Sequence, residues 1–185
     1  MKKNFVTPAC LMFLVMILLV SCQSQQAEEP SWEDKLKETV NQFGHRNWIL
    51  VVDKAFPALS SKDIEVINTD ASMTTVLKKT LDLTVRSLHV KPIVYVDQEF
   101  AFITEGQIAG IENIRKDLHA SIQEFQPQTI AHEKVFSLVT EKSAMFKVLV
   151  LKTTEIIPYS SVFIELDCRY WSAEQEKALR DRMTQ

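Results

Sequence analysis

Two polar residues flank a short apolar run and could carry proton-transfer chemistry. His45 follows Gly44, and Asp53 comes directly after the apolar residues 49–52. A histidine gives or takes a proton near neutral pH, so His45 is a candidate acid–base group. Ligands of open α/β sheets bind beyond the carboxyl ends of strands, which places Asp53 well for contacting one. The alternatives are that His45 caps the preceding helix or faces solvent, and that Asp53 is an ordinary loop acid.

Three blocks of sequence resemble one known family when they are taken in order. The first is Gly44-His45 with Asp53 eight residues after the histidine, the second is His-Glu-Lys at 132–134 with Phe136, and the third is Lys-Thr-Thr-Glu-Ile-Ile-Pro-Tyr-Ser-Ser at 152–161. They resemble the G-H-x-D, D-A-x-x-P, H-E-x-F and T-G-E-x-x-P-Y-x-N motifs of the D-ribose pyranase/L-fucose mutarotase (RbsD/FucU-like) family. The resemblance covers residues 32–168.

This resemblance implies a cofactor-free isomerase that binds a free monosaccharide, ribose-like or fucose-like. Such enzymes interconvert the anomers, or the pyranose and furanose forms, of the sugar by opening and reclosing its ring. The resemblance implies that His45 donates and accepts the proton. It assigns sugar binding to Asp53, His132, Tyr159 and Ser161, and it implies neither a cofactor nor a metal.

The distance between His45 and Asp53 constrains how one site could contain both. Fully extended at about 3.3 Å per residue, residues 45–53 would span about 26 Å, which one monosaccharide cannot bridge. Either residues 45–48 form a turn, or the site combines residues from different subunits. The family forms ring-shaped oligomers with sites at subunit contacts, so the resemblance implies a homo-oligomer.

Three positions depart from the family pattern. Asn47 replaces an acid, Ser161 replaces an asparagine, and Thr154 replaces a glycine that would adopt positive φ more easily. These changes motivate a second hypothesis of a different class, a non-catalytic sugar-binding or interaction lipoprotein of the cell envelope that retains the fold.

The N-terminus is typical of a bacterial lipoprotein signal. Lys2 and Lys3 precede an unbroken apolar run over residues 9–20, which is too short to span a membrane. The run ends in Leu-Val-Ser-Cys, which resembles a lipobox. We therefore expect residues 1–21 to be a signal peptide and Cys22 to be lipidated, the alternative being an ordinary cleaved signal with a chance cysteine.

After Cys22 the sequence predicts a flexible tether and then one domain. Residues 23–30 are polar and lack periodicity, so we expect residues 22–31 to be the lipidated cysteine with its tether and residues 32–185 to form the domain. The lipid would anchor this domain to a membrane of the bacterial envelope, with the outer membrane or periplasm favoured. The chain has 21 Lys and Arg against 24 Asp and Glu, a net charge of −3, so no basic surface favours nucleic acid.

Alternating apolar patterns predict an α/β fold, a layered α/β/α domain with a largely parallel central sheet. The 46% hydrophobic content is that of a globular domain. The expected helices are 32–43 with Gly44 as its C-cap, 73–88, 105–125, a short 132–141 and 172–182. The expected strands are 49–52, 64–67, 93–96, 146–153 and 162–166, and residues 100–103 are ambiguous. His89 and His119 have no partner at metal-ligand spacing, so no metal site is predicted.

Overall fold

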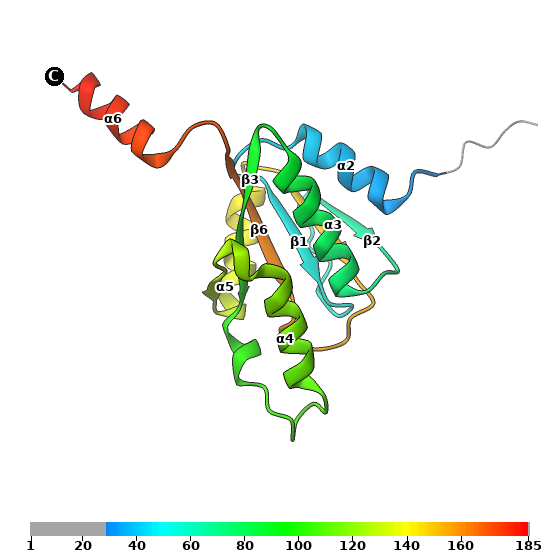
Figure 1. Cartoon of the computed structure of the whole chain (residues 1–185). Helices are drawn as coiled ribbons and strands as arrows, with labels where there is room; N and C mark the ends of the chain where they lie inside the picture. The colour runs from blue at the N-terminus through cyan, green and yellow to red at the C-terminus, as the bar shows by residue number, and fades with distance from the viewer. Residues whose placement is uncertain (1–28, 185) are drawn as a thin grey trace, which may run out of the picture. The chain divides into compact units, whose positions relative to one another are not determined.

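A six-stranded sheet forms the centre of the fold in the computed structural model, which describes residues 29–184 (Figure 1). The spatial order of the strands is β2-β5-β1-β6-β3-β4. Five strands run in one direction, while β6 runs antiparallel to its neighbours β1 and β3. The strands are β1 (Trp48–Val52), β2 (Ile64–Asn68), β3 (Val90–Asp97), β4 (Gln128–Ile130), β5 (Val148–Lys152) and β6 (Val162–Cys168).

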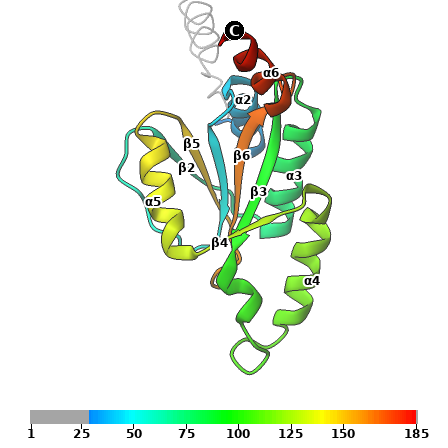
Figure 2. The same cartoon turned by 90° about the vertical axis from the view of Figure 1, so that its left-hand side faces the viewer.

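Helices cover both faces of this sheet. Figure 2 shows α3 and α4 on one side of the strands and α5 on the other, and α2 packs with α3. The helices are α2 (Trp32–Gln42), α3 (Met73–Arg86), α4 (Ile111–Ile122), α5 (His132–Ser143) and α6 (Ala173–Met183), with 3₁₀ turns η1 (Gln98–Phe102) and η2 (Gln123–Phe125). The predicted α/β fold with a largely parallel sheet is confirmed.

Strand β1 shows why the core has two halves. Ile49 and Val51 point into the cluster under α2, α3 and α4, whereas Trp48, Leu50 and Val52 point into the cluster under α5. All five residues are buried, as expected of a central strand covered on both faces. Successive side chains alternate between faces, so an unbroken apolar run fills both clusters.

Two elements differ from the sequence-based prediction. The helix expected over 105–125 begins only at Ile111, because Gly110 adopts a left-handed φ of 83° and the Glu105 carboxylate accepts hydrogen bonds from the backbone N–H groups of Gly110 and Glu112. The short strand β4 was not predicted. Its three residues pair in parallel with β3 at the edge of the sheet, and this pairing decides their conformation.

The end of α2 also differs from the prediction. Ser31 caps its start as expected, since the Ser31 side chain accepts from the backbone N–H of Asp34. The helix ends at Gln42 with Phe43 in an extended conformation, and the left-handed residue after it is Arg46, with φ 72°, rather than Gly44. Gly44 therefore does not act as the predicted left-handed C-cap.

The predicted signal peptide at 1–21 and the predicted lipidated Cys22 lie outside the described residues, as does the predicted tether up to residue 28. From Ser31 onward the chain forms one compact unit. None of the helices between residues 29 and 184 combines the length and the apolar character needed to cross a bilayer.

Candidate functional site

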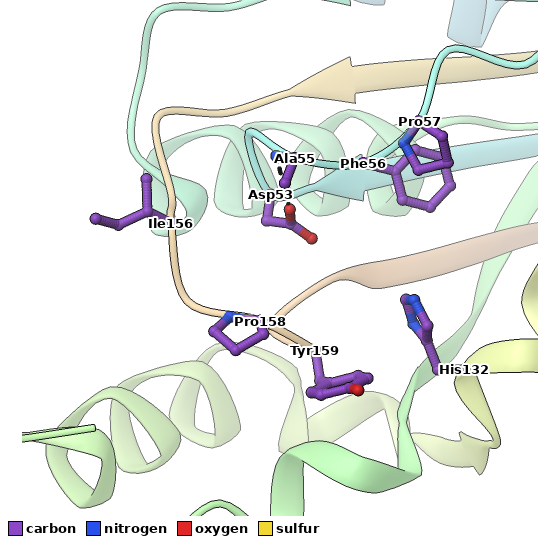
Figure 3. A pocket seen from close by; sticks show the side chains of 8 residues that line it. All are labelled: Asp53, Ala55, Phe56, Pro57, His132, Ile156, Pro158 and Tyr159. Atoms are coloured by element: carbon purple, nitrogen blue, oxygen red, sulfur yellow. Dashed lines mark hydrogen bonds between the residues drawn. The ribbon is translucent and has the colours of Figure 1, made fainter. Parts of the chain in front are cut away.

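A pocket of about 260 Å³ opens at the edge of the sheet where β1 and β5 end (Figure 3). It lies between the loop that follows β1, the loop that joins β5 to β6, and the start of α5. Its lining residues are Asp53, Ala55, Phe56, Pro57, His132, Ile156, Pro158 and Tyr159. The volume suits a small ligand, and apolar walls with a few polar groups are the usual composition of a binding site.

Asp53 is a polar residue of the pocket wall, and two hydrogen bonds hold its carboxylate in a fixed orientation. One carboxylate oxygen accepts from the backbone N–H of Ala55 at 2.8 Å, and the other accepts from the Ser161 hydroxyl at 3.1 Å. Asp53 is buried, with 8% of the residue exposed, and it lines the pocket. Two donors thus orient Asp53 while its oxygens, which accept several bonds each, remain able to take a ligand hydroxyl.

The β5–β6 loop brings Tyr159 to the opposite side. Glu155 braces this loop, because one carboxylate oxygen accepts from the backbone N–H groups of Ile156 and Ile157. Tyr159 itself adopts a left-handed φ of 59°, which is costly for a bulky residue. Strained backbone of this kind concentrates at functional sites, and here it turns an aromatic ring into the pocket wall.

His132 is the titratable ring of the pocket. It is the first residue of α5, and its ring meets the ring of Tyr159 edge-on, with centroids 5.0 Å apart. Its Nδ1 lies 3.0 Å from a carboxylate oxygen of Asp97, the last residue of β3. Its backbone N–H donates to both carboxylate oxygens of Glu99, at 3.0 and 3.1 Å.

The electrostatics of Asp97 are unusual. The residue is 1% exposed, and its second carboxylate oxygen, Oδ2, has no hydrogen-bond partner among the described residues. The pKa of Asp97 is raised to about 6, chiefly by burial and to a lesser extent by the nearby carboxylates of Glu99 and Asp53, against the lowering effect of the hydrogen bond and charge of His132. Asp97 and His132 therefore form a hydrogen-bonded pair in which the carboxyl group is buried and the half-buried imidazole lines the pocket.

His45 lies away from this pocket in the same chain. It is exposed in the turn that precedes β1, whereas Asp53 follows the last residue of β1, so the length of the strand separates the two. Asn47, in the same turn, has a structural role. Its amide donates to the carbonyl of Gly44, and its side-chain oxygen accepts from the backbone N–H of Lys147 at 2.8 Å.

The structure thus brings together three of the five residues predicted to act on a sugar. Asp53, His132 and Tyr159 line one pocket, while Ser161 is fully buried behind Asp53 and His45 is at the other end of β1. Asp97 was not predicted. An acid at the carboxyl end of a predicted strand is a signal that could have drawn attention to it.

The described part of the chain contains no group of three or more His, Cys, Asp or Glu side chains arranged to hold a metal ion. The departure Thr154 is accommodated without strain. Its φ is not positive, and both its backbone N–H and its hydroxyl donate to the carbonyl of Ala71.

Comparison with known proteins identifies the family of this chain. A model of the RbsD / FucU transport protein family matches residues 28–168, which include every element from α2 to β6. The chain belongs to this family. No curated protein sequence matches it.

Solved structures of the RbsD / FucU family share the fold at low sequence identity. The structure of Bacillus subtilis RbsD complexed with D-ribose aligns with a TM-score of 0.52 and 17% identity, covering 76% of this chain and 96% of that one. The fucose mutarotase from Streptococcus pneumoniae in complex with L-fucose gives 0.52 and 14%, covering 75% and 96%. FucU from Bifidobacterium longum gives 0.50 and 17%, covering 71% and 91%.

Proposed function

We propose that this chain is a cofactor-free mutarotase or pyranase that interconverts ring forms of a free ribose-like or fucose-like monosaccharide. The observation that carries the proposal is the joining of Asp53, His132 and Tyr159 in one small pocket. These residues come from the three motif blocks of the RbsD / FucU family. The ribose and L-fucose bound to two structural neighbours are sugars of the proposed class.

The proposed reaction needs only proton transfer and orientation. A base takes the proton from the anomeric hydroxyl while the ring oxygen gains a proton, so the bond between the anomeric carbon and the ring oxygen breaks and an open-chain aldehyde forms. If the aldehyde rotates and the hydroxyl formed from the former ring oxygen attacks it again, the other anomer forms. If a different hydroxyl of the sugar attacks the aldehyde, the ring size changes. A carboxylate such as Asp53 would accept hydrogen bonds from sugar hydroxyls, and the Tyr159 ring would pack against the apolar face of the sugar.

His45 enters this proposal as a residue of a second copy of the chain. Within one chain it lies beyond β1 from Asp53, and an exposed histidine is available to a neighbouring subunit. An interface that joins the turn of one copy to the pocket of the next would be heterologous, and such an interface forms a ring when the rotation between successive copies closes. The proposal therefore includes a homo-oligomer in which His45 donates and accepts a proton in its neighbour's pocket.

The cellular setting is proposed on the sequence signal alone. The apolar run at 9–20 followed by Leu-Val-Ser-Cys supports cleavage before Cys22 and lipidation of its thiol. The lipid would hold the domain at a membrane of the bacterial envelope. We expect Cys22→Ser to release the protein from the membrane fraction, and membrane association of this variant would contradict the anchor.

Magnetisation-exchange NMR on the full-length chain tests the activity. Anomer and ring-form interconversion is followed in ribose, fucose, galactose and glucose, with and without protein. We expect faster exchange for one sugar, and we expect His132→Gln to slow it by about 100-fold because the pocket loses its titratable ring. His119→Gln is the matched control, since His119 is an exposed histidine that does not line this pocket.

Two outcomes would contradict the enzymatic proposal. If no sugar exchanges faster than in buffer while one of them binds, the chain is a non-catalytic sugar-binding protein that retains the fold. The complete burial of Ser161 on Asp53 is the observation that favours this second candidate, because it removes one predicted hydrogen bond to the sugar. If no sugar binds, both candidates fail.

A further inference from the structure

We propose that Asp97 is a positioning residue that fixes the tautomer of His132, so that His132 Nε2 serves the pocket as an acid–base group. This inference rests on the proposed sugar isomerisation. It changes the role that the sequence suggested for His132, from a sugar-binding residue to one that transfers a proton. It also gives a role to Asp97, which no sequence motif included.

Strand pairing brings the side chains of Asp97 and His132 together. Asp97 ends β3, and His132 follows β4 by two residues, so the parallel pairing of these strands brings the two side chains to the same edge of the sheet. The Nδ1···Oδ1 distance is 3.0 Å. An ionised carboxylate only accepts hydrogen bonds, so it requires a proton on Nδ1, and a neutral imidazole then carries its lone pair on Nε2.

Neighbouring groups hold the imidazole ring of His132 in place. The Glu99 carboxylate holds the backbone N–H of His132, and the rings of Phe136 and Tyr159 contact the imidazole edge-on with centroids 5.1 and 5.0 Å away. Figure 3 shows the imidazole extending from the ribbon into the same open space as Asp53 and Tyr159. Nδ1 is therefore occupied from behind, and Nε2 is the nitrogen left for a ligand.

Burial makes an ionised carboxyl group unfavourable at the position of Asp97. Asp97 Oδ2 is buried without a partner among the described residues, and burial raises the pKa of the group. The charged or titratable groups that face it are His132, Glu99 and Asp53, of which the two carboxylates disfavour its ionisation. A buried carboxyl group with a raised pKa whose hydrogen-bond partner is a pocket histidine is typical of a functional site, because a hydrocarbon side chain could be buried there at a lower cost in free energy.

Asp53, which lines the pocket, and Asp97, which lies beside it, have different hydrogen-bond partners and so different roles. Asp53 is held by the hydroxyl of Ser161 and the backbone N–H of Ala55 and shares no hydrogen bond with an imidazole of residues 29–184, so it is suited to binding sugar hydroxyls. In the proposed step His132 Nε2 takes the proton from the anomeric hydroxyl, and His45 of a neighbouring copy gives a proton to the ring oxygen, as the ring opens. Both protons are returned when the ring closes. The negative charge of Asp97 stabilises the imidazolium that exists between these two transfers.

The experiment uses the full-length chain and reads position and chemistry separately. Long-range ¹H–¹⁵N spectra of protein labelled at histidine report which nitrogen of His132 carries the proton, with His132→Gln assigning the signal. We expect the Nδ1–H tautomer in the wild type and its loss of dominance in Asp97→Leu, which removes the acceptor. Unchanged tautomer populations in Asp97→Leu would overturn the positioning role.

Exchange NMR then separates rate from affinity. We expect Asp97→Asn, which keeps the shape of the side chain but not its charge, to slow exchange of the bound sugar by about 10-fold while its Kd changes less than about 2-fold. Glu165→Gln is the matched control, because Glu165 is a half-buried carboxylate that accepts from the Tyr95 hydroxyl outside the pocket.

The failures of the two proposals are distinguishable. An active wild type with the same rate in Asp97→Asn and in Glu165→Gln overturns the dyad and leaves the sugar isomerase standing. A wild type that accelerates no sugar overturns the isomerase and with it the proton transfer by His132. In that case the tautomer spectra still decide whether Asp97 positions the ring.

Discussion

The two ends of strand β1 are both closed by hydrogen-bonded loops, yet they use their polar side chains in opposite ways. At the start, Asn47 bonds two backbone groups from different segments, and His45 is exposed. At the finish, Asp53 is fixed by Ser161 and Ala55 and still faces a pocket. The first arrangement consumes the polar groups in holding the fold, whereas the second holds a polar group in place for a ligand.

The difference between the two ends of β1 shows that residues of one sequence motif can lie at two separate places in the fold. Gly44-His45 and Asp53 belong to one family motif, but five buried strand residues separate its halves in space. The pocket of one chain therefore takes its second and third polar residues from the later blocks, as His132 and Tyr159. The end of β1 that carries His45 is exposed in the single chain, and under the proposed function it would serve a neighbouring copy.

The largest expected effect is in a subunit-complementation experiment, which tests whether His45 acts in the pocket of a neighbouring subunit. His45→Ala and His132→Gln variants are each expected to be inactive, because each removes one proton-transfer group. If His45 acts in a neighbour's pocket, mixed oligomers formed from equal amounts of both will regain about a quarter of the wild-type exchange rate, the fraction of sites that receive both intact residues. A double variant that carries both changes is the control. No recovery in verified mixed oligomers would contradict the action of His45 in a neighbour's pocket.

The next largest effect concerns the pH dependence of stability at the pocket end. The pKa of Asp97 is raised from 3.8 to about 6, so the folded state binds this proton more tightly than the unfolded state. This contribution to stability is fully present below about pH 4 and is lost as the pH rises through about 6, a difference of about 3 kcal/mol.

Urea unfolding between pH 4 and pH 7 measures this contribution in the wild type and in Asp97→Asn. We expect the free energy of unfolding of the variant, relative to the wild type, to rise by about 2 kcal/mol over this range because the variant lacks the titrating group. Parallel pH curves for the two proteins would contradict the raised pKa.

At the start of β1, Asn47→Ala tests whether the turn serves stability alone. The variant loses two side-chain hydrogen bonds, which we expect to lower the free energy of unfolding by about 2 kcal/mol. Thermal or urea unfolding measures this loss, with the exposed Gln42→Ala on α2 as the control. Binding of the sugar should be unchanged, and a weakened affinity at undiminished stability would mean that Asn47 belongs to the site.

The smallest expected effect is at Ser161. Ser161→Ala leaves Asp53 without one of its two fixing donors, and we expect the Kd for the sugar to rise about 5-fold, about 1 kcal/mol of binding free energy. Ser143→Ala is the matched control, a buried serine on α5 that donates to a backbone carbonyl away from the pocket. Equal affinities in both variants would show that Ser161 does not position Asp53.

Local chemistry made part of the fold predictable. The apolar run at 49–52, the serine caps Ser31 and Ser72, and the apolar face of α3 are short-range patterns that can be recognised without any tertiary contact. Strand β4 could not be predicted in this way. Its residues are three in number and mostly exposed, and the hydrogen bonds that make it a strand come from β3, more than thirty residues earlier.

By itself the sequence determined the layered α/β class, the polar residues of the motif blocks and the loop position of Asp53. Only the tertiary structure decided which of those residues meet. Strand order and direction place the ends of β1, β3, β4 and β5 at one edge, which joins Asp53, Asp97, His132 and Tyr159 and leaves His45 at the opposite edge. The physical reason is that spacing along the chain sets local conformation, whereas proximity between distant segments depends on strand pairing.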